Sequence, residues 1–287
     1  MKNSWETYGA AFRGGKILAA RVVNDGVKLT VTSLLTSDDN PSGESLDSGQ
    51  LIFNVNENQA IVKNIDIKAV SGFKVDDLVR FELSQALLDP PTEYYYDALP
   101  IGETNGYRRF LTIAYHRREI DRQIDEYSHR LRKPSGFRLN SVALARGYLT
   151  FCRRDQEDLQ ILVDVDCDGC IMTTLYKNSI YGINRLTTLI DEKDMDSQAL
   201  QLAREIKMTI AFQLARLVQD DIAIEPGQLT LSGKLAESDL FFDTLKNNLS
   251  LKVARPVFNL DHFQPTETTI DKYSPALFLI PLGLAVT

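Results

Sequence analysis

The sequence predicts an α/β protein built as two lobes or as one large composite domain. Its 287 residues exceed the roughly 150 residues of a typical domain. With 44% hydrophobic and 25% charged residues, it has the composition of an ordinary folded protein with a large core. β-Branched runs alternate along the chain with segments whose apolar residues recur at helical spacing.

The amino-terminal part predicts strands. Two β-branched runs within residues 16–35 flank Asn24-Asp25-Gly26, which favours the positive φ of a tight hairpin turn. Residues 37–49 are rich in Ser, Asp and Gly and predict a solvated loop. Further strands are expected at 51–55 and 60–70.

The middle of the chain mixes helices and strands. An apolar spacing of about 3.6 residues indicates a helix at 75–88, which Pro90-Pro91 stops. Strands are expected on either side of residues 102–106. Helices are then expected at 117–131, which is highly charged, and at 141–152, which is apolar.

The last part predicts a hairpin with its turn at 167–169. Helices are expected at 197–217 and 238–247, and strands at 228–232 and 251–257. The final apolar segment, 276–286, contains Pro281 and is shorter than the ~20 residues that a membrane-spanning helix needs. We therefore expect it to be buried in the protein.

Charge and cysteine usage indicate the kind of partner and compartment. The net charge of −7 argues against nucleic acid or an anionic membrane as the main partner, since both usually require a basic face. Three cysteines are an odd and low number, which favours a reduced compartment. Residues 1–12 lack an apolar run of signal-peptide length. We expect a cytoplasmic protein that meets the membrane only through a partner.

Two motifs carry possible chemistry of their own. Residues 164–169, DVDCDG, match the start of a calcium loop, but Leu175 stands where a bidentate Glu is required. Cys167 and Cys170 form a C-x-x-C, which needs a helix N-terminus for redox chemistry or two more ligands for zinc. A polar hairpin turn is the alternative for both motifs.

The run Tyr94-Tyr95-Tyr96 is either a binding surface or a strand with one buried face.

Taken in order, several segments resemble the PilM family of the actin-like ATPase superfamily, with FtsA as a more distant relative. YGAAFRGGKILAARVV is similar to the first strand and phosphate-1 loop, with Ala10 or Ala11 in place of the usual Asp. LVDVDCDGCIMTTLY is similar to the second phosphate hairpin, with Asp166 in place of a glycine. LAREIKMTIAFQL resembles the helix beside the ribose and base, and LTLSGKLAESDLFF the adenosine motif.

The resemblance implies an actin-like (ribonuclease H-like) fold of two α/β lobes. A small α/β insert at about 56–134 would lie in the first lobe. The implied limits are 1–158 for the first lobe, 159–270 for the second, and 271–287 for a segment that returns to the first lobe.

The resemblance also implies a nucleotide site, with no catalytic residue and no metal ligand assigned. If the site is retained, its residues are Gly14, Gly15, Lys16, Asp164, Asp166, Gly169, Glu205, Ser232, Gly233 and Lys234. The phosphate-1 Asp is missing, the adenosine loop has lost a glycine, and Asp166 and Asp168 would repel phosphate unless a metal intervened. We expect weak or absent ATP binding, no useful hydrolysis and no cofactor. An ATP-binding switch or ATPase that uses ATP with Mg²⁺ is the alternative.

The function implied by the resemblance is that of an adaptor at the inner-membrane platform of a type IV pilus or related secretion machine. Such a protein grips the short cytoplasmic tail of a PilN-like bitopic membrane protein between the first lobe and its insert. The candidate contact residues are Phe81, Glu82, Gln85, Tyr95 and Asp97. Self-association is possible, and no nucleic-acid partner is implied.

Overall fold

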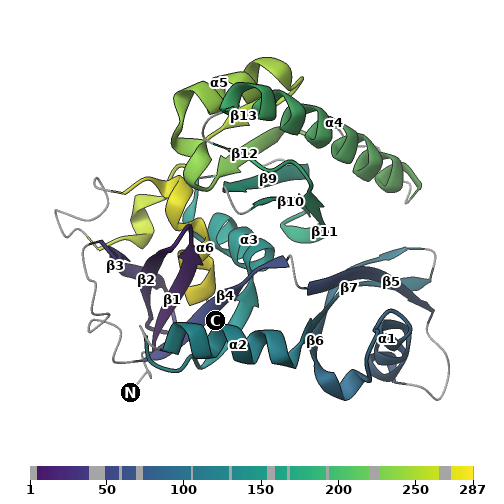
Figure 1. The fold of residues 1–287 in the computed structure, drawn as a ribbon. Coiled ribbons are helices and arrows are strands. Elements are labelled where there is room, and N and C mark those ends of the chain that lie inside the picture. Colours follow the sequence, from purple (N-terminus) through teal and green to yellow (C-terminus); the bar gives the residue numbers. More distant parts are fainter. Residues whose placement is uncertain are drawn as a thin grey trace.

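Three β-sheets with helices packed on their faces make up the computed structural model (Figure 1). The structure describes residues 5–38, 49–57, 60–68, 74–104, 106–128, 131–153, 159–166, 169–191, 194–219, 226–264 and 273–286. Part of the predicted loop at 37–49, and Cys167 and Asp168 of the predicted hairpin turn, lie outside these residues.

The first sheet has five strands in the order β3-β2-β1-β4-β8. They span β1 Trp5–Arg13, β2 Lys16–Asn24, β3 Leu29–Thr36, β4 Gln50–Val55 and β8 Gly136–Leu139. β1, β2 and β3 are antiparallel neighbours, while β4 and β8 continue the sheet in parallel. The predicted hairpin turn is present: Asn24 Oδ1 accepts a hydrogen bond from the Gly26 amide at 2.8 Å, and Gly26 has a φ of 80°.

The second sheet repeats this pattern, in the order β11-β10-β9-β12-β13. Its strands span β9 Leu159–Asp166, β10 Gly169–Tyr176, β11 Ser179–Leu186, β12 Gln228–Ser232 and β13 Lys252–Ala254. Strand β11 was not predicted. It follows a tight turn in which Lys177 and Asn178 both have positive φ, 47° and 62°. Two five-stranded sheets with the same strand pattern give the two lobes that were expected.

A third, three-stranded sheet forms the insert, in the order β5-β7-β6. It comprises β5 Ala60–Lys68, β6 Tyr94–Thr104 and β7 Tyr107–His116. Helix α1, Val75–Ser84, packs Val79 and Leu83 onto one face of this sheet, together with Tyr94 of β6. Helix α2, Arg117–Ser128, follows β7 and places Tyr127 against the first sheet.

Helices α3, Asn140–Phe151, and α6, Pro275–Ala285, form the core that joins the lobes. Figure 1 shows α6 lying between the first sheet and the second lobe. The two helices touch at glycines: a Cβ on Gly147 would lie 2.0 Å from the Leu279 carbonyl oxygen. The predicted buried segment at the end of the chain is thus a helix, and Pro281 lies within it.

Helices α4, Met195–Gln219, and α5, Asp239–Asn248, cover the second sheet. Both match predicted helices, and Ser238 caps α5 by accepting a hydrogen bond from the Phe241 amide. Among the helices that the structure describes, none is long and apolar enough to cross a membrane. The exact limits of the lobes stay a prediction.

Candidate functional site

The carboxyl ends of β9 and β12 meet in the cleft between the lobes. Asp164 and Asp166 come from β9, and Ser232 ends β12. The Ser232 hydroxyl donates to Asp164 Oδ1 at 2.9 Å, and the Lys234 backbone amide donates to Asp166 Oδ1 at 3.2 Å. Four of the residues predicted to bind nucleotide are therefore brought into one cluster.

Arg13, at the end of β1, crosses from the first lobe and pairs with both carboxylates. Its Nη1 lies 3.0 Å from Asp164 Oδ1, its Nη2 2.5 Å from Asp164 Oδ2, and its Nε 2.5 Å from Asp166 Oδ2. The side chains are 10%, 3% and 11% exposed for Arg13, Asp164 and Asp166. Arg13 is thus a buried cation at the centre of the cleft.

The charges of this cluster are coupled. Burial alone would lower the pKa of Arg13, but Asp164 and Asp166 outweigh it and raise that pKa above its usual range. Burial and the neighbouring Asp164 raise the pKa of Asp166, because one guanidinium does not fully neutralise two buried carboxylates. Asp166 was expected to repel phosphate unless a metal intervened, and in this structure Arg13 pairs with it. Asp168 lies outside the described residues.

Arg13 was not among the predicted site residues. The signal that could have found it was a basic residue at the end of the first strand, opposite two carboxylates at alternate positions of a second strand. This pattern indicates an ion pair only once the fold places the two strand ends opposite each other across the cleft.

A small cavity lies beside the carboxylates of this cluster. The cavity bordered by Arg13, Asp164, Asp166 and Gly169 measures about 30 Å³, which suits a few waters rather than a triphosphate. The Ser232 side chain faces this cluster, where its hydroxyl binds Asp164. The next residue, Gly233, has a φ of 94°.

The other predicted nucleotide residues lie outside the cluster. Gly14, Gly15 and Lys16 form the turn between β1 and β2 and border a second cavity of about 250 Å³, which Arg13 also lines. Lys16 Nζ pairs with Asp38 at 2.5 Å on the surface.

Glu205 on α4 is also apart from the cluster. Its two carboxylate oxygens accept four hydrogen bonds, from the backbone amides and hydroxyls of Thr187 and Thr188, at 2.5–3.0 Å. Burial alone would raise the pKa of Glu205, but these bonds outweigh it and lower the pKa. In this structure Glu205 therefore ties α4 to the segment that follows β11.

A buried carboxylate, Glu57, lies at the start of α3. Its Oε1 accepts a hydrogen bond from the Ser141 amide at 2.5 Å, while its Oε2 is buried without a partner among the described residues. Burial raises the pKa of Glu57 to about 7, despite the bonds from Ser141. Glu57 is thus a titratable group inside the first lobe at neutral pH.

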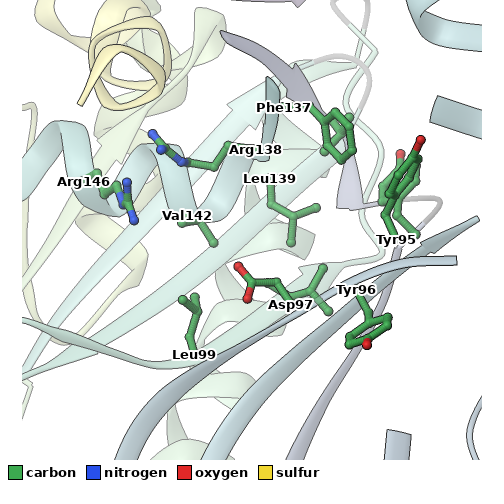
Figure 2. Close-up of a pocket in the computed structure, with 12 residues that line it drawn as sticks. Tyr95, Tyr96, Asp97, Leu99, Phe137, Arg138, Leu139, Val142 and Arg146 are labelled. Carbon is green, nitrogen blue, oxygen red and sulfur yellow. The ribbon is translucent and has the colours of Figure 1, made fainter. Parts of the chain in front are cut away.

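A larger groove separates the insert from the first lobe, with a volume of about 410 Å³. One wall is the insert sheet, through Tyr95, Asp97 and Leu99 of β6 (Figure 2). Alternation along β6 turns Tyr94 and Ala98 to the opposite face, where they pack with α1. Within the tyrosine run, Tyr94 is thus buried, whereas Tyr96 is 39% exposed and Tyr95 and Tyr96 border the groove.

The facing wall belongs to the first lobe. Phe137 and Leu139 of β8 and Val142 of α3 supply an apolar surface (Figure 2). The Tyr95 ring joins the two walls at one end, because it meets Phe137 edge to face at 5.3 Å. The Arg117 guanidinium lies 4.2 Å from the centre of the same Tyr95 ring.

Two of the five predicted partner contacts, Tyr95 and Asp97, line this groove. Phe81, Glu82 and Gln85 lie on or beside α1, across the insert sheet from the groove, and their side chains are exposed. The groove residues that the sequence did not single out are those of β8 and α3. They were predicted only as a short strand and an apolar helix, because nothing local distinguishes a groove wall from a core.

The end of the groove away from Tyr95 is basic. Arg138 of β8 and Arg146 of α3 both line it, and each donates from Nη1 to the Val286 carbonyl, at 2.8 and 3.1 Å. Burial, and then the neighbouring Arg146, lower the pKa of Arg138 to about 10. Two like charges are therefore held side by side where water is partly excluded.

Comparison with known proteins finds similarity in structure but not in sequence. No family model and no curated protein matches the chain. A chain of the solved PilM–PilN type IV pilus biogenesis complex superimposes with a TM-score of 0.70 at 14% identity, covering 97% of both chains.

Two further solved structures match less well. The cytoplasmic domain of EpsL, an inner-membrane component of the Vibrio cholerae type II secretion system, gives a TM-score of 0.47 at 10% identity, covering 97% of this chain and 92% of that one. A Bacteroides thetaiotaomicron protein of unknown function with an actin-like ATPase fold gives a TM-score of 0.49 at 9% identity, covering 99% of this chain and 96% of that one. The chain has the two-lobed actin-like ATPase fold, with a small α/β insert in its first lobe.

Proposed function

We propose that this chain is a non-catalytic adaptor at the inner-membrane platform of a type IV pilus or related secretion machine. In this role it stays in the cytoplasm and holds the short tail of a PilN-like bitopic membrane protein. The observation that carries the proposal is the groove between the insert and the first lobe, in a chain whose fold is similar to that of a chain in a solved PilM–PilN complex.

The groove suits an extended peptide. Both of its walls include a strand at the edge of a sheet, β6 of the insert and β8 of the first lobe. Edge strands offer unpaired backbone groups to an added strand, and the apolar side chains between them accept anchors. A volume of about 410 Å³ is in the range of sites that bury a few side chains.

The nucleotide site is degenerate in this proposal. Arg13 lies among the carboxylates of the cleft, and the cavity beside them, at about 30 Å³, is small for a triphosphate. A nucleotide would have to displace a buried guanidinium held by two carboxylates, and that displacement would leave the carboxylates facing phosphate. This arrangement favours the adaptor over an ATP-binding switch.

The decisive experiment measures tail binding. The probe is a synthetic peptide with the cytoplasmic tail sequence of a single-span membrane protein encoded beside this chain, titrated by fluorescence anisotropy. We expect micromolar affinity for the parent and at least about tenfold weaker binding by Leu99→Lys, which puts a charge on the half-buried groove wall.

The matched control is Leu200→Lys, on α4 of the second lobe, where the leucine is 38% exposed. This control should bind the peptide as the parent does. No binding by the parent at tens of micromolar, or equal binding by Leu99→Lys, would count against the adaptor.

The degenerate site has its own test. Calorimetric titration of the parent with ATP and Mg²⁺ should give no measurable heat of binding. Micromolar binding would defeat this part of the proposal and favour the ATP-binding switch.

A further inference from the structure

The two arginines of the groove carry more positive charge than the described residues neutralise. Arg138 Nη1 donates to the carbonyls of Gly283, Leu284 and Val286, and Arg146 Nη1 shares the Val286 carbonyl. These carbonyls form the carboxyl end of α6, which carries only about half a negative charge. Among the described residues, no carboxylate forms an ion pair with either arginine, including Asp97 on the opposite wall.

Among the described residues, the carbonyl bonds use only part of each guanidinium. These four contacts are made by Nη1, whereas a guanidinium has five N–H donors in a planar fork. The Nε and Nη2 edge of such a fork matches the two oxygens of a carboxylate. The arginines therefore anchor α6, and both lie at the end of the groove away from Tyr95, with N–H donors that these bonds do not use (Figure 2).

We propose that the segment bound in this groove carries an Asp or Glu side chain that pairs with Arg138 and Arg146. An apolar side chain on the same face of that segment then fills the surface formed by Phe137, Leu139 and Val142. This inference rests on the proposed function, because it names the chemistry of the tail that the groove receives.

The geometry sets the order of the two anchors. In an extended segment, residues two positions apart point to the same side. The basic end of the groove adjoins its apolar surface, since Arg146 follows Val142 by one helical turn on α3. An acidic residue and an apolar residue separated by a single position therefore suit this wall.

The experiment selects peptides without assuming a partner. Random peptides displayed on phage are selected against the full chain, and those whose binding is lost with Leu99→Lys and kept with Leu200→Lys are retained as groove binders. We expect the retained peptides to share an Asp or Glu near an apolar residue. Changing that acid to Gln or Asn should weaken binding about tenfold to a hundredfold.

A charge exchange separates pairing from general attraction. Arg146→Glu should weaken binding of the acidic peptides by a similar factor. Replacing the acidic residue of the peptide with Lys should restore binding to this variant. Arg204→Glu, an exposed arginine on α4, makes the same change in net charge and should have little effect. The acid-to-amide change in the peptide keeps the test valid even if Arg146→Glu destabilises the chain.

Three outcomes would overturn the inference. Groove-binding peptides without any acidic preference, equally bound by Arg146→Glu and Arg204→Glu, would refute the acidic anchor and leave the adaptor proposal standing. Failure to select any groove-dependent peptide would refute both. Dimerisation of the parent that Leu99→Lys abolishes would identify a second copy of the chain as the occupant instead.

Discussion

Replacing Arg13 with Met should destabilise the protein severely. The substitution keeps most of the buried aliphatic stem but leaves Asp164 and Asp166, which are 3% and 11% exposed, without their cation. Removing one partner of a buried ion pair costs about 3–5 kcal/mol, because the remaining charge stays desolvated. For a chain of this size, that corresponds to a fall of roughly 6–15 °C in the melting temperature.

The assay is thermal and urea unfolding followed by circular dichroism, with a rescue variant beside the single change. Arg13→Met combined with Asp164→Asn and Asp166→Asn removes all three charges and should recover most of the lost stability. Arg21→Met is the matched control: Arg21 pairs with Glu6 in a more open position, 39% and 22% exposed, and its loss should cost at most about 1 kcal/mol.

Two results would refute this reasoning. A single Arg13→Met variant that unfolds at the parent's midpoint would show that the cluster does not hold the lobes together. A triple variant that remains as unstable as the single one would show that the effect comes from packing of the arginine stem rather than from unpaired charge.

Three further predictions concern groups inside the fold. Because the pKa of buried Glu57 is raised from 4.5 to about 7, the contribution of this group to stability is fully present below pH 4.5 and is lost as the pH rises through about 7. The free energy of unfolding of Glu57→Gln should therefore be about 3 kcal/mol higher than that of the parent at pH 8 and equal to it near pH 4.5. Equal stability of the two proteins in thermal melts at pH 8 would contradict this. A Cβ on Gly283 would lie 1.7 Å from the Ala143 carbonyl oxygen, so Gly283→Ala should cost at least about 2 kcal/mol in urea unfolding. An unchanged urea midpoint would disprove the close contact of α3 and α6. The lowered pKa of Glu205 means that its contribution is present above pH 4.5 and lost as the pH falls, so Glu205→Gln should be less stable than the parent at pH 7 and approach it at lower pH. A constant difference across this range would show that charge is not involved.

Local pattern predicted most of the secondary structure. The hairpin turn at Asn24-Asp25-Gly26, strand β12 and the capped start of α5 at Ser238 each depend on neighbouring residues, so the sequence signals them directly. Strand β11 was missed because its turn uses Lys177 and Asn178 in place of the glycine that usually marks positive φ.

The resemblance of several segments in order indicated the fold, and the two matching five-stranded sheets confirm it. It also pointed to the side of the insert that faces the first lobe as the place for a partner. It did not separate Tyr95 and Asp97, which line the groove, from Phe81 on α1, which lies across the insert sheet. That separation depends on which face of the sheet the helix covers.

The sequence by itself therefore indicated the class of fold and the order of most of its elements, because these follow from short segments. Only the tertiary structure decided which charged side chains meet. Arg13 and Asp164 are 151 positions apart, and Arg138 and the Val286 carbonyl are 148 apart, so no local pattern couples them. Folding brings these groups together, and their burial makes each pairing matter for stability.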